Sequence, residues 1–235
     1  MSEYKTLKGI KIKTFATDLS GESAEGQVFF STAAPQRELK TVVASAAFSS
    51  GGPLITARTW IGATGTQTAA LYSGGTLAPN TRFVNTEEYD GTGFSTGGNL
   101  NTGKGNSGAA GTQTAGIHAM GNVGGNAPPA VANVEEYNGT SWTEVNDIPA
   151  ARINFSGGGT QTAGIVFGGA PGSGVVTLLY DGTNWATTSN LATSRTQLGS
   201  AGTAAAALCI GGKPTTAATE EFTEIAANTQ SLDVS

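Results

Sequence analysis

The sequence predicts an all-β fold built from four repeated units, preceded by a short N-terminal segment. Three observations predict it: a spacing motif that occurs four times, Asp-Gly or Asn-Gly turns between β-rich runs, and nearly absent helix signals. The chain has 235 residues, of which 35 are glycine, and only 12% are charged. Abundant Gly, Ala, Thr and Ser suit tight turns and closely packed strands.

The spacing motif consists of an aromatic residue, a basic residue ten positions later and Gly-Thr seven positions after that. The units recur after 46, 48 and 43 residues, a period typical of propellers and other repeat folds. The four members are Phe48/Arg58/Gly65, Phe94/Lys104/Gly111, Trp142/Arg152/Gly159 and Trp185/Arg195/Gly202.

Each unit also contains the elements of a small antiparallel sheet. An apolar run follows Gly-Thr, and a later aromatic strand ends in an Asp-Gly or Asn-Gly turn, which is a strong hairpin signal. The hairpins are expected to join Tyr89 to Phe94, Tyr137 to Trp142 and Tyr180 to Trp185. One unit therefore offers about four short strands, the content of one propeller blade. The predicted repeats are 48–93, 94–141, 142–184 and 185–235.

The order of these signals resembles the kelch repeat: Arg, an apolar strand to Gly-Gly, Glu-Tyr-Asp, a turn, Trp and the next Arg. The resemblance covers residues 42–235 and implies a kelch-like β-propeller of about four blades. Phe222 is not followed by an aromatic strand, and Phe48 has no Glu-Glu-Tyr before it. We therefore expect residues 42–50 to pair with residues 219–223 and close the ring. Donation of this strand to a neighbouring subunit remains the alternative.

Residues 1–41 are predicted to form a separate β-hairpin attachment arm. The first forty residues carry a net charge of about +1, against −6 for the rest of the chain. Residues 8–15 alternate like a half-exposed strand, and residues 25–43 read as strand, polar turn, strand. An isolated hairpin is marginal in water, so the arm is expected to dock on a partner.

A second resemblance concerns this arm. Glu25 to Phe30, a turn and Leu39-Lys40 resemble a hairpin near the N-termini of bacteriophage tail-fibre and appendage proteins. The repeated Gly-Thr-Gln-Thr-Ala is similar to kelch-like proteins of viruses that infect marine cyanobacteria. Both resemblances imply a virion component that is made in the host cytoplasm and contacts other virion proteins through residues 1–41.

Enzymatic chemistry and cofactors are not expected. Kelch-type copper oxidases use two histidines, and this chain has one, His118. His118 and Cys209 occupy the same repeat column, but two ligands are too few for a structural zinc site. No metal is therefore predicted. A membrane-spanning run is also missing from the sequence, so no membrane insertion is expected.

The basic column, Arg58, Lys104, Arg152 and Arg195, allows two interpretations. It could bind an acidic glycan, or it could pair structurally with glutamates. Three units contain a glutamate pair, and the remaining unit has Leu178 and Leu179 in its place. Repetition in every unit favours the structural role. Net negative charge argues against nucleic acid as a partner.

Ligand recognition is instead assigned to the variable loops, and above all to Asn80, Arg82 and Phe83 in the first loop. The predicted function is that of a non-enzymatic virion structural protein, of the tail-fibre, appendage or capsid-decoration type. Its propeller would face outward toward a host-surface glycan or protein, in multiple copies or as a homo-oligomer. A cellular kelch-type module that binds a peptide or glycan is the alternative.

Overall fold

The computed structural model describes residues 4–7, 10–15, 28–31, 38–41, 48–77, 81–124 and 129–224. Every regular element in these residues is a β-strand, which confirms the all-β prediction. Within these ranges no helix has the length and apolar character needed to cross a membrane. The chain forms two compact units, Met1–Ser50 and Gly51–Ser235.

The first unit contains one four-stranded sheet. β3 (Val28–Ser31) pairs with β4 (Glu38–Thr41) in antiparallel fashion, which confirms the predicted hairpin. β1 (Tyr4–Leu7) pairs with β2 (Ile10–Phe15), and β2 lies parallel to β3. The unit is thus larger than a single hairpin, as expected from the low stability of two isolated strands. The charge distribution predicts a boundary near residue 41, at the end of β4, whereas the first compact unit extends to Ser50.

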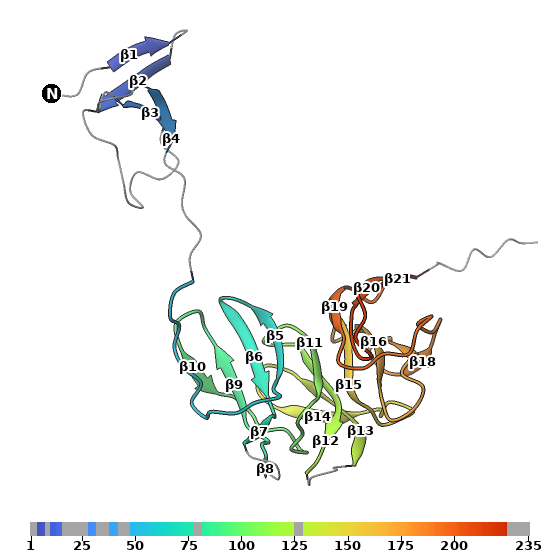
Figure 1. Cartoon of the computed structure of the whole chain (residues 1–235). Coiled ribbons are helices and arrows are strands. Elements are labelled where there is room, and N and C mark those ends of the chain that lie inside the picture. The colour runs from blue at the N-terminus through green and yellow to red at the C-terminus, as the bar shows by residue number, and fades with distance from the viewer. Residues whose placement is uncertain are drawn as a thin grey trace, which may run out of the picture. The chain divides into compact units, whose positions relative to one another are not determined.

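The second unit contains four repeat sheets, numbered here in chain order (Figure 1). Repeat sheet 1 comprises β5 (Gly62–Thr66), β6 (Ala69–Ser73), β9 (Thr86–Tyr89) and β10 (Phe94–Thr96). Repeat sheet 2 comprises β11 (Gly108–Gly111), β12 (Gly116–Asn122), β13 (Ala130–Tyr137) and β14 (Trp142–Val145). Repeat sheet 3 comprises β15 (Ile153–Thr160), β16 (Ala163–Ala170), β17 (Thr177–Tyr180) and β18 (Trp185–Thr187). Repeat sheet 4 has three strands, β19 (Gly199–Gly202), β20 (Ala206–Ile210) and β21 (Thr219–Thr223). A short pair, β7 (Thr76–Leu77) and β8 (Thr81–Arg82), lies between β6 and β9 in the chain.

All four repeat sheets are antiparallel, and the three predicted hairpins are confirmed. Tyr89 pairs with Phe94, and the same register joins Tyr137 to Trp142 and Tyr180 to Trp185. Because the turn holds these two strands together, the last strand of each sheet belongs to the following sequence repeat. Only the glycine of each turn has a positive φ, and the preceding Asp or Asn instead accepts two backbone N–H bonds with its side chain.

The backbone conformation explains why the glycine of Gly-Thr recurs in every repeat. Gly65 has a φ of 108°, and a Cβ there would lie 2.3 Å from the carbonyl oxygen of Ala69. Gly111, Gly159 and Gly202 have φ values of 102°, 104° and 105°. A side chain at this position would therefore strain the turn between the first two strands of every repeat sheet.

The first strands of the repeat sheets lie next to one another in chain order, β5 beside β11, β11 beside β15, and β15 beside β19 (Figure 1). These strands are rich in glycine and alanine, which allows their close approach. Larger apolar side chains of the second and third strands form the core, including Leu71, Ile117, Ile165 and Tyr180.

The described residues of the second unit form small antiparallel sheets and no closed ring. Repeat sheet 4 lacks the fourth strand that β10, β14 and β18 provide elsewhere. The predicted closing strand, residues 42–50, lies partly outside the described residues, because these resume at Phe48. Residues 48–50 belong to no strand, and the Phe48 side chain is fully exposed.

Candidate functional site

Each repeat sheet has one buried basic side chain just before its first strand. All four are at most 7% exposed: Arg58, Lys104, Arg152 and Arg195. Three of them contact the first glutamate of the pair on the third strand of the same sheet. The pairs are Arg58 Nη1 with Glu87 Oε1 at 2.9 Å, Lys104 Nζ with Glu135 Oε1 at 3.3 Å, and the Arg195 guanidinium with Glu220.

The same carboxylates hold the loop that leads to the cation. Glu135 accepts hydrogen bonds from the backbone N–H of Asn101 at 2.7 Å and of Thr102 at 3.2 Å. Those two residues lie three and two positions before Lys104. Glu87 and Glu220 accept bonds from the equivalent loops. Each carboxylate therefore contacts a buried cation and also accepts from backbone amides of the preceding loop, which ties that loop to the sheet.

Burial and pairing shift the pKa of these groups in opposite directions. Burial lowers the pKa of Arg58 and of Lys104, and the facing carboxylates of Glu87 and Glu135 counteract part of that effect. Burial raises the pKa of Glu220, but bonds from Ala192 N–H and the Arg195 guanidinium lower it further than burial raises it. For Arg58 and Lys104, the facing carboxylate therefore offsets part of the cost of burying the charge.

Repeat sheet 3 replaces this polar arrangement with an apolar one. Leu178 occupies the position of the glutamate, and Pro149 occupies the loop position whose N–H the glutamate would accept. Proline has no N–H, so no donor is left unsatisfied there. Ile148, the next residue toward the N-terminus, packs with Leu178 in one buried cluster. The sequence showed the leucine replacement, but the matching role of Pro149 required the structure.

Arg152 is consequently the cation with the weakest pairing. Its Nη1 donates to the carbonyl of Gly168 at 3.4 Å, and its Nε has no partner within the described part of the chain. Burial lowers the pKa of Arg152 with no carboxylate to oppose it. The structural contribution of the basic column should therefore differ between Arg152 and the other three.

The residues predicted to bind ligand in the first loop make internal contacts. Arg82 Nε donates to Asn122 Oδ1 at 2.6 Å, and Arg82 Nη1 donates to Thr76 Oγ1 at 2.8 Å. Phe83 lies 5.9 Å below the Arg58 guanidinium in a cation–π arrangement. Asn80 lies outside the described residues. Arg82 and Phe83 thus connect this loop to its surroundings, and their role in recognition stays a prediction.

His118 lies between the first two repeat sheets, fully buried. Its Nδ1 is 2.6 Å from Ser73 Oγ, and its ring packs edge-on against Trp142 at 5.9 Å. Burial, reinforced by the charge of Lys104, lowers the pKa of His118 well below 6.5. The histidine therefore packs as a neutral core residue. Among the described side chains, no three of His, Cys, Asp or Glu gather as metal ligands.

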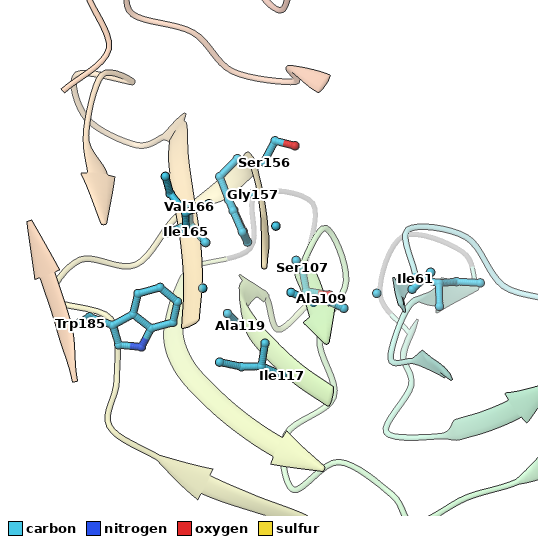
Figure 2. A pocket seen from close by; sticks show the side chains of 17 residues that line it. Ile61, Ser107, Ala109, Ile117, Ala119, Ser156, Gly157, Ile165, Val166 and Trp185 are labelled. Carbon is cyan, nitrogen blue, oxygen red and sulfur yellow. The ribbon is translucent and has the colours of Figure 1, made fainter. Parts of the chain in front are cut away.

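One pocket of about 270 Å³ opens among the first and second strands of repeat sheets 1 to 3 (Figure 2). Its walls are mostly apolar, and Trp185 and Ile61 lie on opposite sides of it. Two polar atoms on the lining residues, Ser107 Oγ and Trp185 Nε1, are buried and have no partner within the described residues. The pocket therefore combines mostly apolar walls with two buried polar atoms that lack a partner in the described part of the chain.

The unpaired indole of Trp185 follows from one residue change. The equivalent Trp142 donates from Nε1 to Thr86 Oγ1 of the preceding repeat sheet at 2.8 Å. For Trp185 the position equivalent to Thr86 is Val134, which offers no acceptor. The sequence did not lead to a prediction of this pocket, although valine in place of threonine at this repeat position could have indicated it. No family model matches the chain, and no curated protein matches it.

Proposed function

We propose that the four repeat sheets are blades of a kelch-like β-propeller, with about four blades per chain. Their antiparallel order and the adjacent first strands support this arrangement. Residues 42–50 would supply the missing fourth strand of repeat sheet 4, with Phe48 in the place that Phe94, Trp142 and Trp185 hold in the other sheets. The strand would come from the same chain or from a neighbouring one.

The function that fits this architecture best is that of a non-enzymatic bacteriophage virion protein, of the tail-fibre, appendage or capsid-decoration type. The observation that carries the proposal is the division into a small N-terminal unit with its own sheet and a repeat array. The N-terminal unit docks on other virion proteins, and the array faces outward. The resemblance of its hairpin to phage appendage proteins supports this polarity.

The repeat array serves as a rigid scaffold in this proposal. Three of the four buried cations are paired with glutamates of their own sheet, which supports a structural use of the basic column. Host-surface glycan is the ligand class proposed for the array, with the pocket at Trp185 and the first loop around Arg82 as candidate contacts.

Deletion of residues 1–38 tests the attachment role. The truncated chain and the full chain are each supplied during infection, and purified particles are probed for the protein by immunoblot. We expect the truncated chain to fold, as judged by circular dichroism and a cooperative thermal transition, and to be missing from the particles.

Ser95→Ala serves as the matched control, because Ser95 is an exposed residue of β10. This variant should be incorporated like the unmodified chain. Equal incorporation of the truncated and the full chain would reject the attachment role of residues 1–38, and absence of both chains from the particles would favour the cellular interaction module.

A further inference from the structure

Neighbouring repeat sheets are joined by two contacts that recur. Between repeat sheets 1 and 2, the hydroxyl of Tyr137 donates to Glu88 Oε1 at 2.5 Å. The amide of Gln113 donates to two backbone carbonyls of the preceding sheet, Tyr89 at 2.7 Å and Ala70 at 3.3 Å. The second glutamate of each pair thus faces the next sheet, while the first faces the cation.

The same two contacts join repeat sheets 2 and 3. Tyr180 donates to Glu136 Oε1 at 2.8 Å. Gln161 donates to the carbonyls of Tyr137 at 2.9 Å and Gly116 at 3.2 Å. These donors and acceptors occupy the same repeat positions as those of the first interface, so the interface is a repeating structure.

At the third interface the donors and the acceptor are replaced together. Leu179 stands in the place of the glutamate, Phe222 in the place of the tyrosine and Ala204 in the place of the glutamine. All three pack against one buried cluster. The tyrosine hydroxyl is therefore absent from the one interface between described sheets that lacks its glutamate acceptor.

The two ends of the array retain the polar set. Repeat sheet 1 presents the donors Tyr89 and Gln67 at the positions of Tyr137 and Gln113. Repeat sheet 4 presents the acceptor Glu221. It also presents the backbone carbonyls of Ala207 and Phe222, which pair with each other across two strands. Ala70 and Tyr89 form the equivalent pair in repeat sheet 1. Gln67 and Glu221 are exposed, and among the described residues neither Tyr89 Oη nor the Glu221 carboxylate takes part in a hydrogen bond.

The apolar surface of repeat sheet 4 is also uncovered. Ile210 is 43% exposed, whereas Ala119 and Phe167 at the same position of repeat sheets 2 and 3 are 4% and 2% exposed. In repeat sheet 1 this position is Ser73, which is covered by His118 of the next sheet. Among the described residues, nothing covers Ile210 in the way that the following sheets cover Ala119 and Phe167.

We propose that repeat sheet 4 of one chain binds repeat sheet 1 of a second copy of this chain. Tyr89 of one copy donates to Glu221 of the other, Gln67 donates to the Ala207 and Phe222 carbonyls, and Ile210 becomes buried. The proposal rests on the propeller arrangement proposed above. A second copy is the occupant because the two end faces carry the donors and the acceptors of one repeating interface, and Gln67, Glu221 and Ile210 are exposed in the described single chain. Such a head-to-tail contact uses two different surfaces and is closed by rotation into a ring.

Sedimentation equilibrium of the full chain over a concentration series tests the contact. Glu221→Arg and Gln67→Glu should each raise the dissociation constant of the dimer by about tenfold or more. An equimolar mixture should recover association, because the unmodified faces of the two variants meet in one contact. Tyr180→Phe is the matched control, since it breaks the equivalent bond inside the chain and should lower stability without changing association.

Chemical cross-linking distinguishes a second copy from closure within one chain. The double variant Gln67→Cys/Glu221→Cys is treated with a short bismaleimide, with each single variant as control. Cys209 is 2% exposed, and burial raises the pKa of its thiol, so it contributes little background. We expect a cross-linked dimer on a denaturing gel.

A cross-linked monomer, with the unmodified chain monomeric at all concentrations, would overturn the second-copy contact and leave a single-chain propeller. The absence of any cross-link specific to the double variant would overturn both forms of contact between the end faces. The comparison of particle incorporation between residues 39–235 and the full chain tests the virion role, and its outcome does not depend on the cross-linking result.

Discussion

Lys104 Nζ lies 3.3 Å from Glu135 Oε1, and both side chains are completely removed from solvent. Glu135 also accepts two backbone N–H bonds from the loop before Lys104. Removal of this one carboxylate therefore leaves a buried cation without its counter-charge and with only the Asn133 carbonyl as acceptor, and leaves two partly buried amides without theirs.

We expect Glu135→Leu to lower the free energy of unfolding by about 3 to 5 kcal/mol. Adding Lys104→Met removes the uncompensated charge and should restore part of that loss. Denaturant unfolding of the two single variants and the double variant gives the coupling energy. Losses in the two single variants that add up to the loss in the double variant would show that the ion pair contributes nothing and that the backbone bonds account for the effect of Glu135→Leu.

Arg152 should respond differently from the other cations. Since its sheet has Leu178 in place of the glutamate, Arg152→Met removes a buried charge that lacks a carboxylate and should change stability by less than about 1 kcal/mol. Arg58→Met leaves Glu87 buried and unpaired and should cost about 3 to 5 kcal/mol. Arg195→Met should cost less than Arg58→Met, because the Glu220 side chain is 23% exposed.

Unfolding midpoints and host-cell binding are measured together for these three methionine variants. If all three keep their stability and lose binding, the basic column is a ligand site and the structural interpretation is wrong.

His118 should make stability depend on pH. Its folded-state pKa lies well below 6.5, whereas the unfolded chain takes up the proton near 6.5. The unfolded state then binds more protons, so stability is highest above pH 6.5 and falls as the pH drops below that value, by up to about 1.4 kcal/mol per pH unit. His118→Asn keeps a side chain that can hydrogen-bond Ser73 and should abolish this slope. Thermal unfolding between about pH 7.5 and about pH 5.5, above the range in which most carboxylates titrate, measures it. An unchanged slope in His118→Asn would assign it to other groups.

Residues 1–50 are expected to be required for a complete repeat sheet 4. Their deletion would leave the outer edge of β21 (Thr219–Thr223) unpaired, because the strand that β10, β14 and β18 supply elsewhere would be lost. We expect aggregation or loss of cooperative unfolding, measured by light scattering and calorimetry. A soluble fragment 51–235 that unfolds cooperatively would contradict closure by the N-terminal strand.

The sequence alone determined the elements that depend on neighbours in the chain. The Asp-Gly and Asn-Gly turns predicted the pairing of Tyr89 with Phe94, and the constant spacing predicted sheets of about four strands. The hairpin of Val28–Ser31 with Glu38–Thr41 was readable in the same way. Turn chemistry acts over a few residues, so a single local pattern is sufficient to specify it.

Only the tertiary structure decided what each repeated side chain contacts. Glu87 and Glu88 are adjacent and chemically identical, yet the first pairs with Arg58 in its own sheet and the second accepts from Tyr137 of the next. Likewise, Ser73 and His118 meet across 45 residues. Alternate residues of a strand face opposite sides, and the packing of separate sheets determines which partner each side meets. That packing is a property of the assembled array, and no short segment of the sequence records it.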